Sequence, residues 1–311
     1  MKRYVNYLAG VGFASIFGFS FLVTKDALLA FSPFELLFLR FALATALMGA
    51  LALLRLVRLD YRGKDPGPLV LACLFQPILY FASETFGVAK SATSTAGLVL
   101  GALPAAVAAL GALMLKERLT RLQAASLCLS VAGVGLIVLG GGAAQAGEGS
   151  LFGLLCLLGA LASAAFFNIY SRRASRVYSP VELTFAMMAT GALSFGALAL
   201  AESLLGGGAA GAAGAAGARA GLLSRATPGA WGAVLYLGAL SSVVAFFLVN
   251  FSLSRVKASQ SAVFSNLTTV ISVAAGVAFR GEAFGLPELL GSVLIVLGVF
   301  GTNAFGEKAL H

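Results

Sequence analysis

Apolar residues fill long, almost uninterrupted stretches of this chain, and polar residues gather in short segments between them. The stretches run for about 18 to 24 residues, and a helix needs roughly 20 to cross a hydrocarbon core of about 30 Å. They lack the period-two alternation that a transmembrane β-barrel requires, so helices remain. Ten membrane-spanning helices are predicted, beginning near Val5, Phe34, Pro68, Thr93, Leu122, Leu151, Glu182, Gly229, Gln260 and Leu286.

The pattern of these stretches occurs twice in the chain. Residues 8–53 align without a gap with residues 155–200, and 15 of these 46 positions are identical. Residues 86–136 align in the same way with residues 251–301. A repeat of this length in a constant order is a feature of the architecture. The sequence therefore predicts an all-α integral membrane protein with ten transmembrane helices in two five-helix repeats.

An odd number of helices in each repeat determines how the copies are oriented. The second copy enters the membrane from the opposite side, so the two repeats are inverted. Inverted repeats recur in secondary transporters, in which the substrate site lies at the repeat interface near the membrane midplane. The predicted domains are residues 1–145 and 146–311, with a Gly/Ala-rich extracytoplasmic linker at about 205–221.

Composition and charge agree with a membrane location. Hydrophobic residues make up 59% and charged residues 11%, and the mean hydropathy is +0.96, whereas soluble domains carry about 25% charged residues. With a cytoplasmic N-terminus, fifteen Lys and Arg residues fall in inside segments and five in outside segments, which follows the positive-inside rule. The net charge of +9 therefore indicates topology and contact with lipid headgroups, and nothing indicates a nucleic-acid partner. A multi-pass protein of the bacterial inner membrane is predicted, with both termini cytoplasmic.

Sequence motifs for catalysis, metal binding and ATP use are absent. His311, the sole histidine, is the last residue and cannot form a metal site alone. The chain has no Walker A, His-Glu-x-x-His or Gly-x-Ser-x-Gly pattern. No cofactor, metal site or catalytic residue is predicted, and the chain is not expected to be an enzyme.

Two charged residues inside predicted spans have no charged counterpart in the other repeat. Arg40 aligns with Met187, and Glu84 aligns with Val249. A charge inside a membrane span costs on the order of 3 kcal/mol on insertion scales and usually faces a cavity or a partner. These two residues are therefore candidates for a substrate or coupling site.

Glu84 also continues a polar stripe at helical spacing, formed with Gln76 and Tyr80, and Pro77 is available to bend this helix. The stripe is expected to face a wet cavity. We expect Glu84 to bind a cationic substrate group or carry a coupling proton, and Arg40 to hold a carboxylate. Two alternatives are that Arg40 and Glu84 pair with each other, or that Arg40 extends to the outer headgroups.

Neutral polar residues are weaker candidates for the same site. They lie in the fourth, eighth and ninth predicted spans and are Ser94, Thr95, Asn250, Gln260 and Asn266. Small and hydroxyl residues also allow membrane helices to pack closely, which is an equally simple explanation.

Two glutamates at equivalent positions of the two repeats are expected to have a structural role. Glu117 and Glu282 occupy equivalent loop positions on opposite membrane faces. A shared structural role is expected, such as capping a helix or pairing with Lys116 or Arg280.

Several short motifs along both repeats form a characteristic set: Ser-Pro-Phe-Glu-Leu from Ser32, Arg40-Phe41, Pro104, Lys116-Glu117-Arg118-Leu119, Gly133-Val134, Gly281-Glu282 and Gly298-Val299. With these motifs the chain resembles EamA-type proteins of the drug/metabolite transporter superfamily. The resemblance implies two EamA repeats and a metabolite transporter, commonly an exporter, with helices one, three, four, six, eight and nine lining the cavity. Two departures are Phe17, where a tryptophan is frequent, and Thr269, opposite Pro104.

The sequence thus predicts a secondary transporter, an exporter of small metabolites, with amino acids or related zwitterions favoured by the opposite charges of Arg40 and Glu84. A membrane-embedded lipid-handling protein or flippase is the alternative. The expected partners are a small-molecule substrate and membrane lipid, and a proton gradient is a candidate driving force. A monomer and a homodimer both remain open.

Overall fold

The computed structural model describes residues 2–115, 121–137, 150–204, 227–255, 264–282 and 284–307, and every regular element in these ranges is a helix. The helices are α1 (Lys2–Ala27), α2 (Pro33–Leu53), α3 (Gly67–Cys73), η1 (Leu74–Tyr80), α4 (Phe81–Ala89), α5 (Thr93–Gly101), α6 (Leu103–Leu115), α7 (Arg121–Ile137), α8 (Ser150–Ala174), α9 (Pro180–Leu204), α12 (Pro228–Leu235), η3 (Tyr236–Ala245), α13 (Phe246–Leu253), α15 (Ser265–Arg280) and α16 (Leu286–Glu307). The segments η1 and η3 are π-helical. They continue directly into their neighbours, so α3–η1–α4 and α12–η3–α13 each form one long helix.

Seven spans in the described chain are long and apolar enough to cross a membrane: Leu8–Ala27, Pro33–Leu53, Gly67–Ala89, Thr93–Gly111, Leu151–Ala174, Pro180–Leu204 and Pro228–Leu253. They coincide with seven of the predicted stretches. The other three stretches fall on α7, α15 and α16. Helix α7 has 17 residues, and the apolar segments found in α15 and α16, Leu267–Arg280 and Leu289–Gly298, are shorter than a full span. The protein is therefore an all-helical, multi-pass membrane protein, and the count of ten spans stays a prediction.

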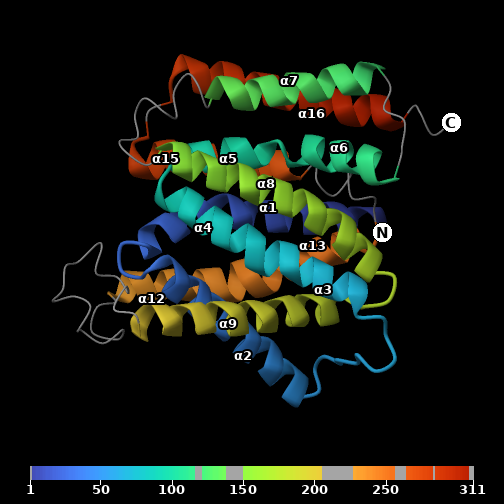
Figure 1. Ribbon diagram of the computed structural model, residues 1–311, viewed down its shortest axis with the longest axis vertical. Coiled ribbons are helices and arrows are strands. Elements are labelled where there is room, and N and C mark those ends of the chain that lie inside the picture. Colours follow the sequence, from blue (N-terminus) through green and yellow to red (C-terminus); the bar gives the residue numbers. More distant parts are fainter. Residues whose placement is uncertain are drawn as a thin grey trace.

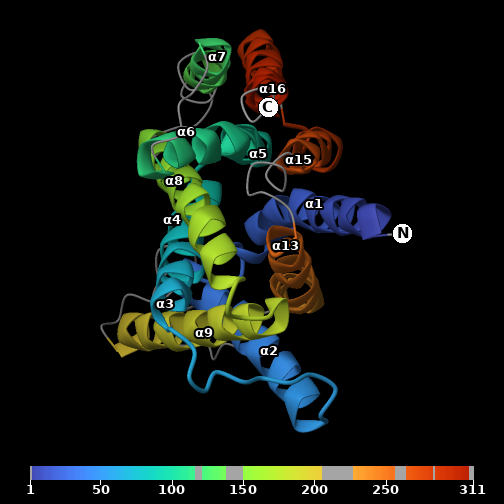
Figure 2. The same cartoon turned by 90° about the vertical axis from the view of Figure 1, so that its right-hand side faces the viewer.

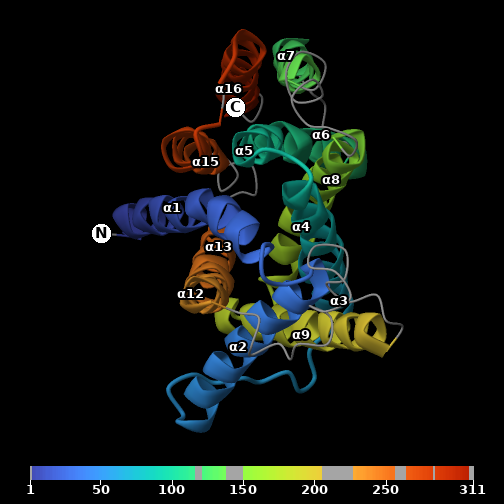
Figure 3. The same cartoon turned by 90° about the vertical axis from the view of Figure 1, so that its left-hand side faces the viewer.

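The helices are stacked one above another in Figure 1, with α7 and α16 at the top and α2 at the bottom. Figures 2 and 3 show that α1, α13 and α15 lie on one side of the molecule and that α4, α6 and α8 lie on the other. The start of α1 and the end of α16 lie on the same side of the stack, the right-hand side in Figure 1.

Equivalent helices of the two repeats pack against each other: α2 against α9, α5 against α15, and α7 against α16. The equivalent glycines Gly133 and Gly298 lie where α7 and α16 cross. A Cβ atom added to Gly133 would lie 2.6 Å from the carbonyl oxygen of Gly291, and one added to Gly298 would lie 2.5 Å from that of Ser126. The absence of a side chain at these positions allows the two backbones to approach closely.

The repeated Ser-Pro-x-Glu-Leu motif begins α2 and α9. At α2, the Ser32 hydroxyl accepts a hydrogen bond from the Glu35 amide, and the Glu35 carboxylate accepts one from the Ser32 amide. Ser179 and Glu182 make the same reciprocal pair at α9. The motif is a capping box, with proline in the first turn, where its missing N–H costs nothing. This local chemistry explains why the motif occurs twice.

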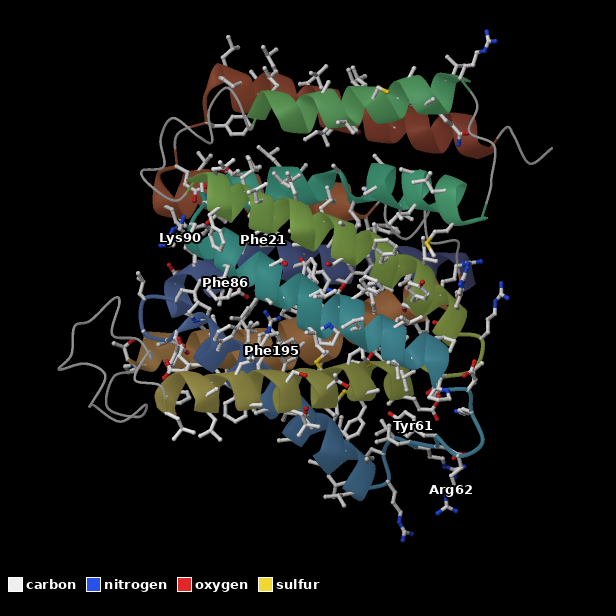
Figure 4. All side chains as sticks on the ribbon, viewed as in Figure 1. Phe21, Tyr61, Arg62, Phe86, Lys90 and Phe195 are labelled. Carbon is white, nitrogen blue, oxygen red and sulfur yellow. The ribbon has the colours of Figure 1, made fainter. Side chains whose placement is uncertain are left out.

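Glu182 also attaches the connection between α2 and α3 to α9. Its carboxylate accepts hydrogen bonds from the Asp60 amide at 3.0 Å and from Lys64 Nζ at 2.7 Å, and the Tyr61 hydroxyl donates to its carbonyl oxygen at 2.7 Å. Burial, followed by the nearby Glu182 charge, raises the pKa of Tyr61 well above its ordinary value. Figure 4 shows Tyr61 at one end of the molecule and Lys90 at the other.

Candidate functional site

A cavity of ≈ 90 Å³ lies between the two groups of helices seen in Figures 2 and 3. A buried water needs roughly 10 to 15 Å³ by the same measure, so the cavity has room for a small solute. Its walls are mostly apolar and aromatic, with a few polar groups, as is usual for ligand sites. The residues that line it are Phe13, Phe17, Ser20, Phe21, Gln76, Tyr80, Phe81, Glu84, Gly97, Leu100, Leu103, Ala164, Phe167, Asn168, Ser241, Phe246, Val249, Thr268 and Thr269.

The polar stripe expected from the sequence lies on the wall of this cavity. Gln76 and Tyr80 belong to η1, and Glu84 follows in α4. Pro77 lies inside η1 and has no N–H to donate, so a regular α-helical hydrogen bond is missing there. The π-helical turn accommodates that gap, and such turns are frequent at functional sites.

The opposite wall uses equivalent positions of the second repeat. Three of the equivalent pairs that line the cavity come from the α3–η1–α4 and α12–η3–α13 helices: Gln76 with Ser241, Phe81 with Phe246, and Glu84 with Val249. The rings of Phe81 and Phe246 meet with centroids 5.6 Å apart. The two walls therefore share a phenylalanine at one equivalent position, but among these pairs only the first wall carries a carboxylate.

Glu84 is buried, with 2% of its surface exposed. Its carboxylate accepts one long hydrogen bond of 3.3 Å, from the hydroxyl of Thr85. Arg40 interacts with it electrostatically, yet in the described part of the chain no Lys or Arg comes within the 4.0 Å of an ion pair with Glu84. A carboxylate with so few protein partners is available to a group in the cavity.

Arg40 neither reaches the headgroups nor forms an ion pair with Glu84, the two alternatives considered for it. It is 2% exposed, so it does not extend to the headgroups, and it forms no ion pair with Glu84. Its Nε donates to the Ser242 hydroxyl at 3.1 Å, and its Nη2 donates to the Ser241 hydroxyl at 3.0 Å. The guanidinium carbon lies 4.4 Å from the centroid of the Phe81 ring, a cation–π distance. Arg40 is therefore beside the cavity, behind Ser241.

The neutral candidates are mostly part of the packing. The amide of Asn250 donates to the Thr184 hydroxyl and accepts a hydrogen bond from the Ser171 hydroxyl. Ser94 and Thr95 are buried but lie off the cavity wall. Gln260 and the side chain of Asn266 are outside the described residues.

Other cavity residues had no distinguishing signal in the sequence. Phe13, Phe17 and Phe21 recur every four residues along α1, but a span that is apolar on every face does not reveal which face is inward. Asn168 is an exception, because it is polar within a predicted span; it lines the cavity, and its amide donates to the carbonyl oxygen of Ala164 at 2.8 Å. Ser241 could have been found only through its equivalence to Gln76.

Glu282 caps a helix of the other repeat. Its two carboxylate oxygens accept hydrogen bonds from the amides of Thr93, at 2.7 Å, and Ser94, at 2.8 Å. These amides begin α5, whose own N-cap residue, Ala92, has no side chain able to accept them. The expected capping role therefore holds for Glu282, but across the repeats. Glu117 lies outside the described residues.

Two further contacts join the same end of the helices. Arg280, which ends α15, pairs with Asp26 of α1 at 2.6 Å instead of with Glu282. Lys25 Nζ donates to the carbonyl oxygen of Ser91, just before α5, at 2.5 Å. Together with Glu282, these contacts connect the ends of α1, α5 and α15.

Glu282→Gln is expected to lower stability by about 1.5 kcal/mol, because the amide oxygen can accept only one of the two backbone hydrogen bonds, and that one without charge, while the NH2 group cannot accept the other. Burial acts to raise the pKa of Glu282, but hydrogen bonds from Ser94 and Thr93 hold it below its ordinary value of 4.5. The stabilisation is therefore complete above pH 4.5 and is lost as the pH falls below that value. Thermal unfolding of detergent-solubilised protein at pH 7 measures the loss. Glu202→Gln, which weakens one hydrogen bond from Ser32, is the control, and an equal loss in both variants would contradict this account.

Comparison with known proteins identifies relatives along almost the whole chain. The model of the EamA-like transporter family matches residues 5–139 and again residues 151–304. The chain is 35% identical over 302 residues to a Bacillus subtilis protein named "Uncharacterized transporter YcxC", covering 97% of this chain and 94% of the relative. It is 25% identical over 304 residues to "Uncharacterized transporter YyaM" of the same organism, covering 96% and 93% of the two chains.

A solved crystal structure shares the fold. It superposes with a TM-score of 0.68 at 23% sequence identity and covers 97% of this chain and 98% of its own. At this identity the likeness concerns the fold alone. The family match and the transporter relatives go further, and they show that this chain is a membrane transporter that belongs to the EamA-like transporter family.

Proposed function

We propose that the protein is a secondary transporter that exports small amine-bearing metabolites, with amino acids and related zwitterions as the favoured class. The observation that carries this proposal is the buried Glu84 carboxylate on the wall of an aromatic cavity. A carboxylate in that setting attracts an ammonium group, and the surrounding rings suit an apolar side chain.

The mechanism that we propose is alternating access. The halves, residues 1–145 and 146–311, would rock against each other around the cavity, whose walls come from equivalent positions of both halves. The predicted linker at 205–221 lies outside the described residues. The distribution of Lys and Arg supports cytoplasmic termini, and export across the bacterial inner membrane is part of the proposal.

Purified protein in liposomes tests this proposal. Uptake of a panel of labelled amino acids and polyamines would be followed with and without an imposed pH gradient, and empty liposomes would be the control. Saturable uptake of at least one amine-bearing compound is expected, and stimulation by the gradient would indicate proton coupling. Movement of labelled lipid between leaflets, with no uptake of any panel compound, would support the flippase alternative and overturn the proposal.

A further inference from the structure

The surroundings of Arg40 indicate a second polar group on the cavity wall, in addition to Glu84. A buried guanidinium is normally paired with a carboxylate, because an unpaired buried charge is costly. Here two serine hydroxyls, of Ser241 and Ser242, take that place. The two serines are adjacent in η3, but only Ser241 lines the cavity.

A serine hydroxyl that accepts a hydrogen bond from a guanidinium still has its own proton to donate. Within the described chain, the Ser241 hydroxyl donates to no protein acceptor. The positive charge behind it strengthens it as a donor, since hydrogen-bonded groups polarise one another. Because Ser241 lines the cavity, its hydroxyl can rotate to donate to a group there, and it prefers an anionic acceptor.

The cavity therefore has two chemically different poles. Glu84 supplies a negative charge on the wall formed by η1 and α4, and Ser241, backed by Arg40, supplies a donor on the wall formed by η3. Each wall also carries an aromatic ring, Phe81 on the first and Phe246 on the second, and the two rings meet. A molecule with an ammonium group and a carboxylate matches both poles.

We propose that Ser241 donates a hydrogen bond to the substrate carboxylate and that Arg40 is a positioning residue, which polarises Ser241 without touching the substrate. This inference rests on the proposed function and narrows it, because it assigns the carboxylate of a zwitterion to a named hydroxyl. Selectivity for amino acids over simple amines then resides in η3.

The test compares two substrates that differ only in the carboxylate. They are the amino acid of the panel with the fastest uptake and the amine formed by its decarboxylation; for leucine this is 3-methylbutylamine. Ser241→Ala is expected to raise KM for the amino acid about tenfold, the effect of one hydrogen bond to a charged group, and to leave KM for the amine unchanged. Ser241→Thr keeps the hydroxyl and should restore most of the affinity for the amino acid.

Arg40→Gln is expected to weaken uptake of the amino acid more than uptake of the amine, because it removes the charge behind Ser241, whereas the loss of its electrostatic interaction with Glu84 acts on both substrates. Ser242→Ala is the matched control: it removes one hydrogen bond to Arg40 but no cavity contact, so any loss should fall equally on both substrates. Saturable uptake of the amine shows that each variant is folded. An equal effect of Ser241→Ala on both substrates, or no effect on either, would overturn the inference.

The outcomes for the wild-type protein separate this inference from the proposed function. Uptake of the amine without uptake of any amino acid would contradict the carboxylate site and leave transport of amines standing. Uptake of neither class would contradict both.

Discussion

Glu84→Gln is expected to weaken the uptake of amine-bearing substrates, with a loss of about tenfold to a hundredfold in kcat/KM. The substitution keeps the shape of the side chain but removes the charge, and a hydrogen bond to a charged group is worth about 1.5 to 3 kcal/mol. The carboxylate has one weak protein partner, Thr85, and otherwise faces the cavity. Uptake into proteoliposomes at several substrate concentrations, with and without a pH gradient, measures the effect.

The control for this experiment is Glu202→Gln, which neutralises a carboxylate at the end of α9, away from the cavity. It should retain wild-type uptake. Thermal unfolding of Glu84→Gln must be measured beside uptake, because the substitution removes the carboxylate that interacts electrostatically with buried Arg40, and a folded variant is needed to assign the loss to the site. Uptake by Glu84→Gln with wild-type kinetics and wild-type response to pH would eliminate Glu84 from both substrate binding and coupling.

Gly133→Val is expected to cause the largest loss of stability among the substitutions considered. Its Cβ atom would lie 2.6 Å from the carbonyl oxygen of Gly291 and 2.9 Å from the amide nitrogen of Ile295. Both are backbone atoms of α16, so no side-chain rotation relieves the clash. Overpacking of this kind costs about 3 kcal/mol, or roughly 5 °C in Tm for a protein of this size. Thermal unfolding in detergent, followed by the loss of monodisperse protein, measures it.

Gly135→Val provides a matched control on the same helix. A Cβ atom at Gly135 meets nothing within 4 Å, so the substitution has the same intrinsic effect on α7 without the contact. Its Tm should stay close to that of the wild type. Equal Tm values for the two variants would show that α7 and α16 do not pack through Gly133.

Much of the fold could be predicted because its signals are local. A run of apolar residues long enough to span the bilayer is a helix whatever surrounds it, since backbone hydrogen bonds must be satisfied within the segment. The capping boxes at Ser32 and Ser179 depend on residues three positions apart. The comparison of the two repeats also identified Glu84 as a charge without a counterpart, and it lies on the cavity wall.

The candidate site was predicted less completely, because its remaining features depend on distant contacts. Arg40 was expected to face a carboxylate directly, but it is bound by two hydroxyls about 200 positions further along the chain. Asn250 was a candidate for the same reason as Gln76, being polar within a span, yet neighbouring helices satisfy its amide. A polar residue in an apolar helix shows that a partner exists and does not show which one.

The sequence by itself therefore determined the class of this protein, the course of most of its helices, the repeat and the unmirrored charges. Each follows from the cost of exposing polar groups to lipid, which acts on every segment separately. Only the tertiary structure decided which faces enclose the cavity, that Glu282 caps α5, and that Ser241 stands between Arg40 and the cavity. Helices that are apolar all round can be rotated in lipid at little cost, so their inward faces are set by close packing and hydrogen bonds between helices far apart in the chain.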